Sequence, residues 1–336
     1  MMYFRPIAMT DTARPAGALP LAGGWCWFDR VEILSRDAPA QLGGLSDLTA
    51  VQRAAFSAPR AGFAGLDLGR PKIMGILNVT PDSFSDGGRF QDHTAALNRA
   101  RAMAVAVDIV DIGGESTRPG AVDVDADDEI ARTAPVIAAL RSTDANLCMS
   151  IDTRKAAVAT AALAAGADIV NDVSALGYDR QMAGVVSRSG APVILMHAQG
   201  TPAGMQTDPR YDDVVLDVYD FLQERLQMAD TAGVARDRIM LDPGIGFGKT
   251  AAHNLALIRG LSMFHGLGCA ILLGASRKRF IGTISGTDEV SARMPGSLAV
   301  ALAGLAQGVQ ITRVHDAAET RQAFALWRAV NLGETI

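Results

Sequence analysis

Hydrophobic and polar residues follow a repeating pattern along most of this chain: short apolar runs alternate with longer amphipathic stretches. From Pro71 onward there are eight such runs, each rich in Val, Ile, Leu and Met: KIMGILN (72–78), VDIVDIG (107–113), LCMSIDT (147–153), ADIVNDV (167–173), PVILMHA (192–198), RIMLDPG (238–244), AILLGAS (270–276) and VQITRVH (309–315). Near-continuous apolar runs of this length are typical of parallel strands buried on both faces. Residues 94–106, 127–140 and 214–230, which lie between runs, have the periodicity of amphipathic helices.

Eight strand-then-helix units predict an α/β fold of the (β/α)8 TIM-barrel type. An open doubly wound sheet has the same alternation, but the count of eight and the lack of a GxGxxG sequence favour the closed barrel. Residues 1–70 do not follow the pattern, since 23–34 resemble a strand or hairpin edge and 46–57 one helix. We therefore expect a short N-terminal appendage of unknown role, residues 1–70, beside a barrel of residues 71–336.

Composition narrows the class of protein without giving a function. Apolar residues make up 49% and charged residues 20% of the 336 residues, which is ordinary for a soluble globular protein. The net charge of −5 argues against a general nucleic-acid surface, so local charges must hold any anionic ligand. We see no secretory signal and no run of the about 18 apolar residues that a membrane helix needs, so we expect a cytoplasmic protein. Cys26, Cys148 and Cys269 lie far apart and are expected to be buried thiols.

Polar side chains gather where the eight runs end, and in a barrel of this type those ends form the active site. They are Asn78, Asp111, Asp152, Asn171, Asp172, Met196 with His197, Asp242, Lys278, Arg313 and His315. Any one of them could be a helix cap or a turn former. Because polar groups that directly follow apolar runs are costly unless they are paired or used, the set as a whole indicates a ligand site.

Two segments near the end of the chain are typical of anion binding. Arg313 and His315 lie two residues apart on a predicted strand, so both side chains should leave the same face, at the place where this fold commonly binds phosphate. In GASRK (274–278), Gly274 allows a close approach, and we expect Ser276 to cap a helix. Lys278 would then lie in the first helical turn, where a cation opposes the helix dipole, so we expect it to serve a ligand.

A third set favours a heterocyclic ligand. Asp152 and Asp242 only accept hydrogen bonds when ionised, whereas the amide of Asn171 both donates and accepts. A heterocycle that carries NH donors and ring-nitrogen acceptors fits such a set, and a sugar fits it less well.

Longer motifs carry a resemblance to a known family. GILNVTPDSFSDGG (75–88), DIGGESTRPGA (111–121), LDPGIGFGK (241–249), GASRK (274–278) and RVHD (313–316) occur in this order, with IDT, IVNDV and LMH among them. From about Pro71 to its C-terminus the chain resembles dihydropteroate synthase, whose fold is a pterin-binding TIM barrel. The resemblance implies that 7,8-dihydropterin-6-ylmethyl diphosphate reacts with 4-aminobenzoate to give 7,8-dihydropteroate and pyrophosphate.

The resemblance also implies roles for individual residues. The pterin would contact Asp152, Asn171, Met196, Asp242, Phe247, Gly274 and Lys278. The diphosphate would contact Asn78, Thr117, Arg313 and His315, and 4-aminobenzoate would contact Phe84, Thr117, Arg118, Pro119 and Ser276. Lys278, Asp82, Arg313 and His315 would take part in catalysis, and Asn78 would bind Mg²⁺, which usually combines few protein ligands with phosphate oxygens.

Two alternative functions stay open at this point. A corrinoid-linked pterin methyltransferase shares the barrel and the pterin pocket, but it has no use for GASRK or for the Arg313–His315 pair. A non-catalytic paralogue would bind pterin without turnover. We also expect a homodimer, partly by family analogy and partly because residues 296–308 form an apolar helix with few charges.

Overall fold

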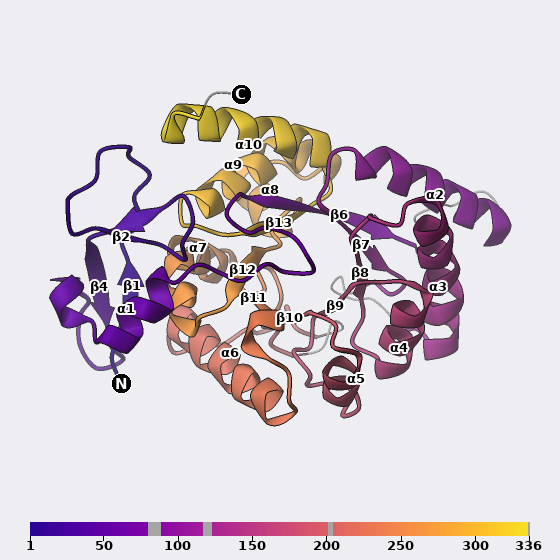
Figure 1. Cartoon of the computed structure of the whole chain (residues 1–336), viewed down its shortest axis with the longest axis horizontal. Coiled ribbons are helices and arrows are strands. Elements are labelled where there is room, and N and C mark those ends of the chain that lie inside the picture. Colours follow the sequence, from indigo (N-terminus) through magenta and orange to yellow (C-terminus); the bar gives the residue numbers. More distant parts are fainter. Residues whose placement is uncertain (80–88, 117–122, 201–203, 335–336) are drawn as a thin grey trace.

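Figure 1 shows the computed structural model of the chain, which describes residues 1–79, 89–116, 123–200 and 204–334. Eight strands form a closed parallel barrel. They are β6 (Lys72–Asn78), β7 (Ile109–Gly113), β8 (Met149–Asp152), β9 (Ile169–Asp172), β10 (Val193–Met196), β11 (Ile239–Asp242), β12 (Ala270–Leu273) and β13 (Ile311–Val314). The barrel closes where β13 pairs with β6. The predicted TIM barrel is therefore confirmed.

Helices follow the strands and surround the barrel (Figure 1). They are α2 (Arg89–Ala104), α3 (Ala126–Thr143), α4 (Ala156–Ala165), α5 (Met182–Ser189), α6 (Val214–Thr231), α7 (Ala251–Arg259), α8 (Arg279–Ser285), α9 (Met294–Leu305) and α10 (Ala317–Leu332). The three helices predicted from periodicity correspond to α2, α3 and α6. In the described part of the chain we find no helix whose length and apolar character would let it span a bilayer.

The register of the strands brings their polar ends to one level. Asn78 is paired with Gly113, Gly113 with Asp152, and Asp152 with Asn171, so β6, β7, β8 and β9 end side by side. Because all the strands are parallel, their carboxyl ends surround the same mouth of the barrel. The polar residues that follow the apolar runs are therefore neighbours in space, although they are far apart in sequence.

The opposite mouth is closed by the chain that leads into β6. Phe63 and Leu68 are buried there against barrel residues that include Met74, Ile194 and Met240. Phe63 is only 1% exposed. Part of the segment that the sequence assigned to the appendage thus packs inside the end of the barrel.

The rest of the N-terminal segment forms a small unit beside the barrel (Figure 1). It contains a sheet of β1 (Tyr3–Pro6), β4 (Arg30–Leu34) and β5 (Gln41–Gly44), a hairpin of β2 (Leu19–Pro20) and β3 (Trp27–Phe28), the 3₁₀ turn η1 (Leu45–Asp47) and α1 (Ala50–Ser57). The predicted helix 46–57 begins later than expected because Thr49 caps α1, its side chain accepting a hydrogen bond from the Gln52 backbone NH.

This unit covers apolar surface of the barrel helices. Leu21, Trp25 and Phe28 share one buried cluster with Leu305 of α9 and Phe324 of α10. Trp25 Nε1 also donates to the Leu305 carbonyl at 2.7 Å. The three cysteines are buried and unpaired, as predicted.

Candidate active site

Arg313, on β13, lies at the polar mouth and contacts two strands, β7 and β8, that follow β6 around the barrel. Its Nε donates to Asp111 Oδ2 at 2.6 Å, and its Nη2 donates to Asp152 Oδ2 at 2.8 Å. Both carboxylates are buried, and Asp111 is fully so. Buried carboxylates are tolerated when they are paired in this way. Arg313 therefore holds the ends of β7, β8 and β13 together.

Asn171 extends this network to β9. Its Nδ2 donates to Asp111 Oδ2 at 3.2 Å, so Asp111 receives hydrogen bonds from both Asn171 and Arg313. These bonds fix the Asn171 amide with its nitrogen toward Asp111. Asp111 was noted in the sequence only as a strand-end residue without a role, but its place inside the apolar run VDIVDIG was a signal, since a carboxylate there needs a partner.

Asp152 keeps one acceptor unused. Its Oδ1 is buried and accepts no hydrogen bond from any residue in the described part of the chain. The pKa of Asp152 is raised to about 7, chiefly by burial; Arg313 opposes this rise and nearby Asp111 contributes to it. A buried acceptor of this kind needs a donor, and a ligand would supply one.

Asp242 approaches the same mouth from the end of β11. Its Oδ1 accepts a hydrogen bond from the Gly244 NH at 2.7 Å. Burial raises its pKa, although Lys278 and the Gly244 NH favour the ionised form. Gly274 lies beside it, since a Cβ at Gly274 would lie 3.4 Å from Asp242 Oδ2. The absence of a side chain at Gly274 thus keeps the approach to Asp242 open.

Lys278 faces Asp242 from the chain that follows β12. Its Nζ donates to the Ile245 carbonyl and lies 4.3 Å from the centre of the Phe247 ring. Burial lowers the pKa of Lys278 to about 8, against the opposing attraction of Asp242. The structure thus brings Lys278, Phe247 and Asp242 together, as the sequence predicted, and it adds Ile245 as a contact.

The start of α8 corrects two details of the sequence analysis. The helix begins at Arg279 and Lys278 is its N-cap residue, so Lys278 does not lie in the first turn. Ser276 is not the cap. Its Oγ accepts a hydrogen bond from the His315 NH at 3.2 Å and lies 3.0 Å from His315 Nδ1. The helix starts late because Arg277 has a φ of +58°, a left-handed conformation that interrupts helical geometry.

The predicted pair Arg313 and His315 is divided between two environments. Arg313 is bound to Asp111 and Asp152, whereas His315 follows the end of β13 and lies against Ser276. The strand ends at Val314, so the alternation that was used to place both side chains on one face does not reach His315. Their joint role at a diphosphate stays a prediction.

Some of the remaining predicted residues lie at strand ends, and others lie outside the described part of the chain. Met196 ends β10 and is buried, and Asn78 ends β6 and is partly buried. Asn78 lies near Asp152, because a Cβ at Gly113 would be 3.8 Å from both Asn78 Oδ1 and Asp152 Oδ2. The residues expected in the two loops lie outside the described part of the chain; they are Asp82, Phe84, Thr117, Arg118 and Pro119.

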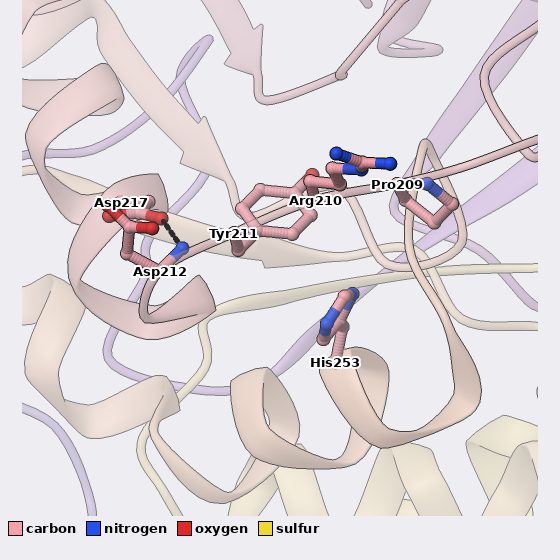
Figure 2. Close-up of a pocket in the computed structure, with 6 residues that line it drawn as sticks. All are labelled: Pro209, Arg210, Tyr211, Asp212, Asp217 and His253. Atoms are coloured by element: carbon pink, nitrogen blue, oxygen red, sulfur yellow. Dashed lines mark hydrogen bonds between the residues drawn. The ribbon is translucent and has the colours of Figure 1, made fainter.

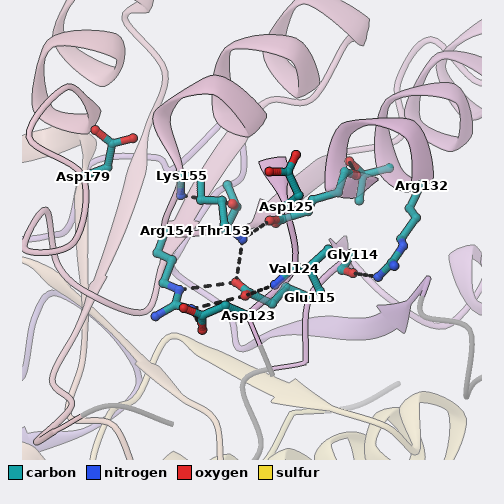
Figure 3. Close-up of polar contacts among 12 residues, drawn as sticks. Gly114, Glu115, Asp123, Val124, Asp125, Arg132, Thr153, Arg154, Lys155 and Asp179 are labelled. Atoms are coloured by element: carbon teal, nitrogen blue, oxygen red, sulfur yellow. Dashed lines mark hydrogen bonds and ion pairs between the residues drawn. The ribbon is translucent and has the colours of Figure 1, made fainter. Parts of the chain in front are cut away.

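A cluster of charges, buried except for the exposed Asp123, links the chain after β7 to the chain after β8 (Figure 3). Lys155 Nζ donates to Glu115 Oε2 at 3.0 Å and to Glu129 Oε2 at 2.6 Å. Arg154 Nη2 donates to Glu115 Oε1 at 3.2 Å and to Asp123 Oδ1 at 2.6 Å. Arg154, Lys155 and Glu115 come two or three residues after the ends of β8 and β7, whereas Glu129 belongs to α3, so the cluster joins the two strand ends to that helix. The sequence analysis missed it.

Comparison with known proteins gives the class to which this site belongs. The family described as pterin binding enzyme matches residues 74–315. The dihydropteroate synthase of Neisseria meningitidis serogroup C is 42% identical over 277 residues, which are 81% of this chain and 97% of that protein. A probable bifunctional folylpolyglutamate synthase/dihydropteroate synthase of Haloferax volcanii is 47% identical over 248 residues, or 74% of this chain, which spans only 29% of that longer protein.

Solved structures agree with these relatives. Xanthomonas albilineans dihydropteroate synthase with 4-aminobenzoic acid has a TM-score of 0.76 and 44% identity, and the match covers 81% of this chain and 98% of that chain. Another structure from the same organism, a complex with 7,8-dihydropteroate, has a TM-score of 0.73 at 41% identity and covers 81% and 98%.

The chain therefore belongs to the pterin-binding enzymes. Within that family its function is that of a dihydropteroate synthase, so it is a transferase. This assignment replaces the corrinoid-linked methyltransferase and the non-catalytic paralogue that the sequence analysis left open.

Proposed function

We propose that this chain carries out the dihydropteroate synthase reaction with the pterin ring bound to Asp152, Asn171 and Asp242. The observation that carries the proposal is Asp152 Oδ1, which is buried without a hydrogen-bond donor among the described residues. Asp152 Oδ2 is already bound to Arg313, so the free oxygen suits an NH of a ligand rather than another side chain. A dihydropterin carries ring NH and exocyclic amine donors that meet this need.

The walls of the pocket would come from apolar and glycine residues. Met196 is buried at the end of β10, and the ring of Phe247 lies under Lys278. Gly274 leaves space beside Asp242. A flat ring would fit between such surfaces, and on binding Lys278 would exchange the Ile245 carbonyl for acceptors on the pterin.

The reaction would proceed by departure of pyrophosphate before the new bond is complete. Departure leaves a cation on the pterin methylene, which the buried carboxylates Asp111, Asp152 and Asp242 would favour. The amine of 4-aminobenzoate then attacks this carbon and loses a proton. No side-chain nucleophile is required, because the leaving group departs with the electron pair of the broken C–O bond.

We also propose the predicted diphosphate contacts, Asn78, Thr117, Arg313 and His315, with Mg²⁺ held at Asn78. Asn78 presents an amide oxygen at the end of β6, and a hard oxygen donor suits Mg²⁺, which usually takes one or two protein oxygens together with phosphate oxygens and water. Bound there, the ion would stabilise negative charge on the leaving diphosphate. His315 would add a donor from the end of β13.

Of the residues predicted to contact 4-aminobenzoate, only Ser276 belongs to the described part of the chain. It lies against His315. Ser276 lies before the start of α8, which begins at Arg279. The contacts with Phe84, Thr117, Arg118 and Pro119 stay proposals that lie outside the described residues.

We keep the homodimer as a proposal. Helix α9 carries no charged residue, and its exposed positions include Pro295, Ala299 and Ala303. The C-terminal end of α9 is covered by the N-terminal unit, where Leu305 is buried with Trp25 and Phe28. Light scattering at micromolar concentrations tests the proposal: a mass near 35.2 kDa would contradict a dimer.

Release of pyrophosphate tests the proposed reaction. The chain should release it only when both the pterin diphosphate and 4-aminobenzoate are present. Asp152→Asn should weaken pterin binding by about 2 kcal/mol, because the new amide turns an NH2 group toward either Arg313 or the ligand NH. Asp237→Asn is the control, since Asp237 is exposed and precedes β11 at the other end of the barrel. Equal pterin affinity in both variants would contradict the proposed role of Asp152.

A further inference from the structure

Lys249 is a buried cation that the proposed reaction does not use. It is one of only four lysines in the chain and is 3% exposed. Its Nζ lies 2.8 Å from His197 Nδ1 and donates to the Phe247 carbonyl at 3.0 Å. A buried amine is costly unless it has hydrogen-bond partners. Here the partners are His197, which follows β10, and the backbone of the loop after β11.

The loop after β11 (residues 243–248) depends on close backbone contact with the chain after β10. Gly244 has a φ of +68°, and a Cβ at this position would lie 1.8 Å from the His197 carbonyl oxygen. Gly248 has a φ of +63°, and a Cβ there would lie 2.4 Å from the Gln199 carbonyl oxygen. Only glycine fits both the conformation and the space at these two positions. The two segments are therefore packed backbone to backbone.

Tyr211 provides a second anchor for the same loop. Its Oη donates to the Gly248 carbonyl at 2.8 Å, and its ring centre lies 5.9 Å from that of His197. Figure 2 shows Tyr211 beside His253 at a surface pocket, and the two ring centres are 5.0 Å apart. Tyr211 thus joins the end of the loop at Gly248 to residues that line the surface pocket.

The same loop contacts the groups that would meet the pterin. The Gly244 NH donates to Asp242 Oδ1 at 2.7 Å, so the start of the loop orients that carboxylate. The Ile245 carbonyl accepts a hydrogen bond from Lys278, and the Phe247 ring lies 4.3 Å from Lys278 Nζ. A shift of the loop backbone would therefore move the Phe247 ring and the Ile245 carbonyl, and these two groups position Lys278.

We propose that Lys249 and Tyr211 are positioning residues for pterin binding. They anchor the loop 243–248 through the carbonyls of Phe247 and Gly248, so that the Phe247 ring and Asp242 keep the positions in which they would meet the pterin. Neither residue touches the substrate, and each acts through the backbone of the loop. The inference rests on the pterin site proposed above and goes further by naming the residues that hold its wall in place.

Two conservative variants test this inference. Lys249→Met keeps the length of the side chain but removes both polar contacts, and Tyr211→Phe removes one hydroxyl. For Lys249→Met we expect the pterin diphosphate KM and the 6-hydroxymethylpterin Kd to rise about tenfold, which corresponds to about 1.4 kcal/mol. For Tyr211→Phe we expect the same pattern at about threefold. Both kcat and the 4-aminobenzoate KM should stay within about twofold, because the anchors do not touch the reacting atoms.

Lys72→Met is the matched control, since Lys72 lies at the start of β6, at the opposite end of the barrel, where it pairs with Asp108 at 3.7 Å. It should leave the pterin KM unchanged. Thermal unfolding of all three variants separates a loss of fold from a loss of affinity, because general destabilisation does not raise one KM selectively at temperatures well below unfolding.

Unchanged pterin affinity in Lys249→Met would overturn the inference, and so would a fall in kcat without a change in KM. If Lys249→Met does not fold, Tyr211→Phe provides the test. Unchanged pterin affinity in Tyr211→Phe would then overturn the inference. A wild-type chain that binds the pterin but releases no pyrophosphate would overturn the proposed reaction alone, because the positioning test reads pterin affinity. A wild-type chain that does not bind the pterin would overturn both.

Discussion

Lys278 lies over the ring of Phe247, with its Nζ 4.3 Å from the ring centre. The contact attaches the cation to the loop after β11, where the Ile245 carbonyl also accepts its hydrogen bond. Burial lowers the pKa of Lys278 to about 8, because the surroundings disfavour the charged amine more than Asp242 favours it. Lys278 therefore changes its charge within the pH range in which the enzyme can be assayed.

We expect kcat/KM for the pterin diphosphate to fall as the pH rises through about 8, because deprotonation of Lys278 removes a positive charge that attracts the substrate. Lys278→Arg should be less active at neutral pH. Its profile should stay flat on the alkaline side, because a guanidinium does not titrate there. The measurement is pyrophosphate release from about pH 6.5 to 10. An alkaline fall of the same shape in Lys278→Arg would assign the titration to another group.

Asp111 should prove as important as the residues that the sequence identified. Asp111→Asn keeps an acceptor for Arg313 Nε but loses the negative charge that pairs with the guanidinium. We expect the free energy of unfolding to fall by about 1–3 kcal/mol, as for other buried charge-assisted hydrogen bonds. The pKa of Asp152 should also fall below its value of about 7, because Asp111 helps to raise it. Urea unfolding measures the first effect, and carboxyl NMR titration measures the second.

The control for Asp111→Asn is Asp237→Asn at the other end of the barrel, where the side chain is exposed. Its stability should change by less than about 0.5 kcal/mol. If both variants lost the same stability, the Arg313–Asp111 contact would contribute nothing beyond an exposed aspartate.

Removal of divalent metal should stop pyrophosphate release, and added Mg²⁺ should restore it. Asn78→Ala removes the amide oxygen proposed as the protein ligand, so it should raise the Mg²⁺ concentration needed for half-maximal activity by about tenfold. Pterin affinity without metal should not change, which separates a metal effect from damage to the pocket. Full activity of Asn78→Ala at low Mg²⁺ would remove Asn78 from this role.

The fold could be predicted from the sequence because the apolar runs that indicate its strands are local patterns. The run KIMGILN corresponds residue for residue to β6 (Lys72–Asn78), since Pro71 precedes it and the polar Asn78 ends it. The run VDIVDIG was too long by two residues, because β7 begins at Ile109. Parallel strands must end at one mouth, so the sequence also placed Asp152, Asn171 and Asp242 together.

The contacts inside the site were not readable, because they depend on distances across the barrel. Arg313 and Asp111 are 202 residues apart, and no local pattern indicates that they pair. The residue type of Ser276 indicates a helix cap, but the left-handed Arg277 delays the helix and leaves Ser276 to His315. Lys249 is part of a recognised motif, yet only the packed structure shows that its amine is buried against His197.

The buried cluster that joins the ends of β7 and β8 to α3 gives the last prediction. Glu129 is fully buried, and Lys155 is its ion-pair partner among the described residues, at 2.6 Å. Burial raises the pKa of Glu129, whereas Lys155 opposes the shift. Lys155→Met leaves this carboxylate without its counter-charge, so we expect the free energy of unfolding to fall by about 3–5 kcal/mol. The loss should grow as the pH rises, because the raised pKa of Glu129 means that its ionised form is the destabilised one in the folded state.

The double variant Lys155→Met with Glu129→Gln distinguishes a charge effect from a packing effect. It removes the unpaired charge, so it should recover part of the lost stability and most of the added pH dependence. Arg36→Ala serves as the exposed control. Arg36 pairs with Asp217 at 2.7 Å on the surface, and its removal should cost less than about 1 kcal/mol. Chemical unfolding at several pH values measures all three variants. If the double variant were as unstable as Lys155→Met at every pH, the cluster would act through packing, and the electrostatic account of it would be wrong.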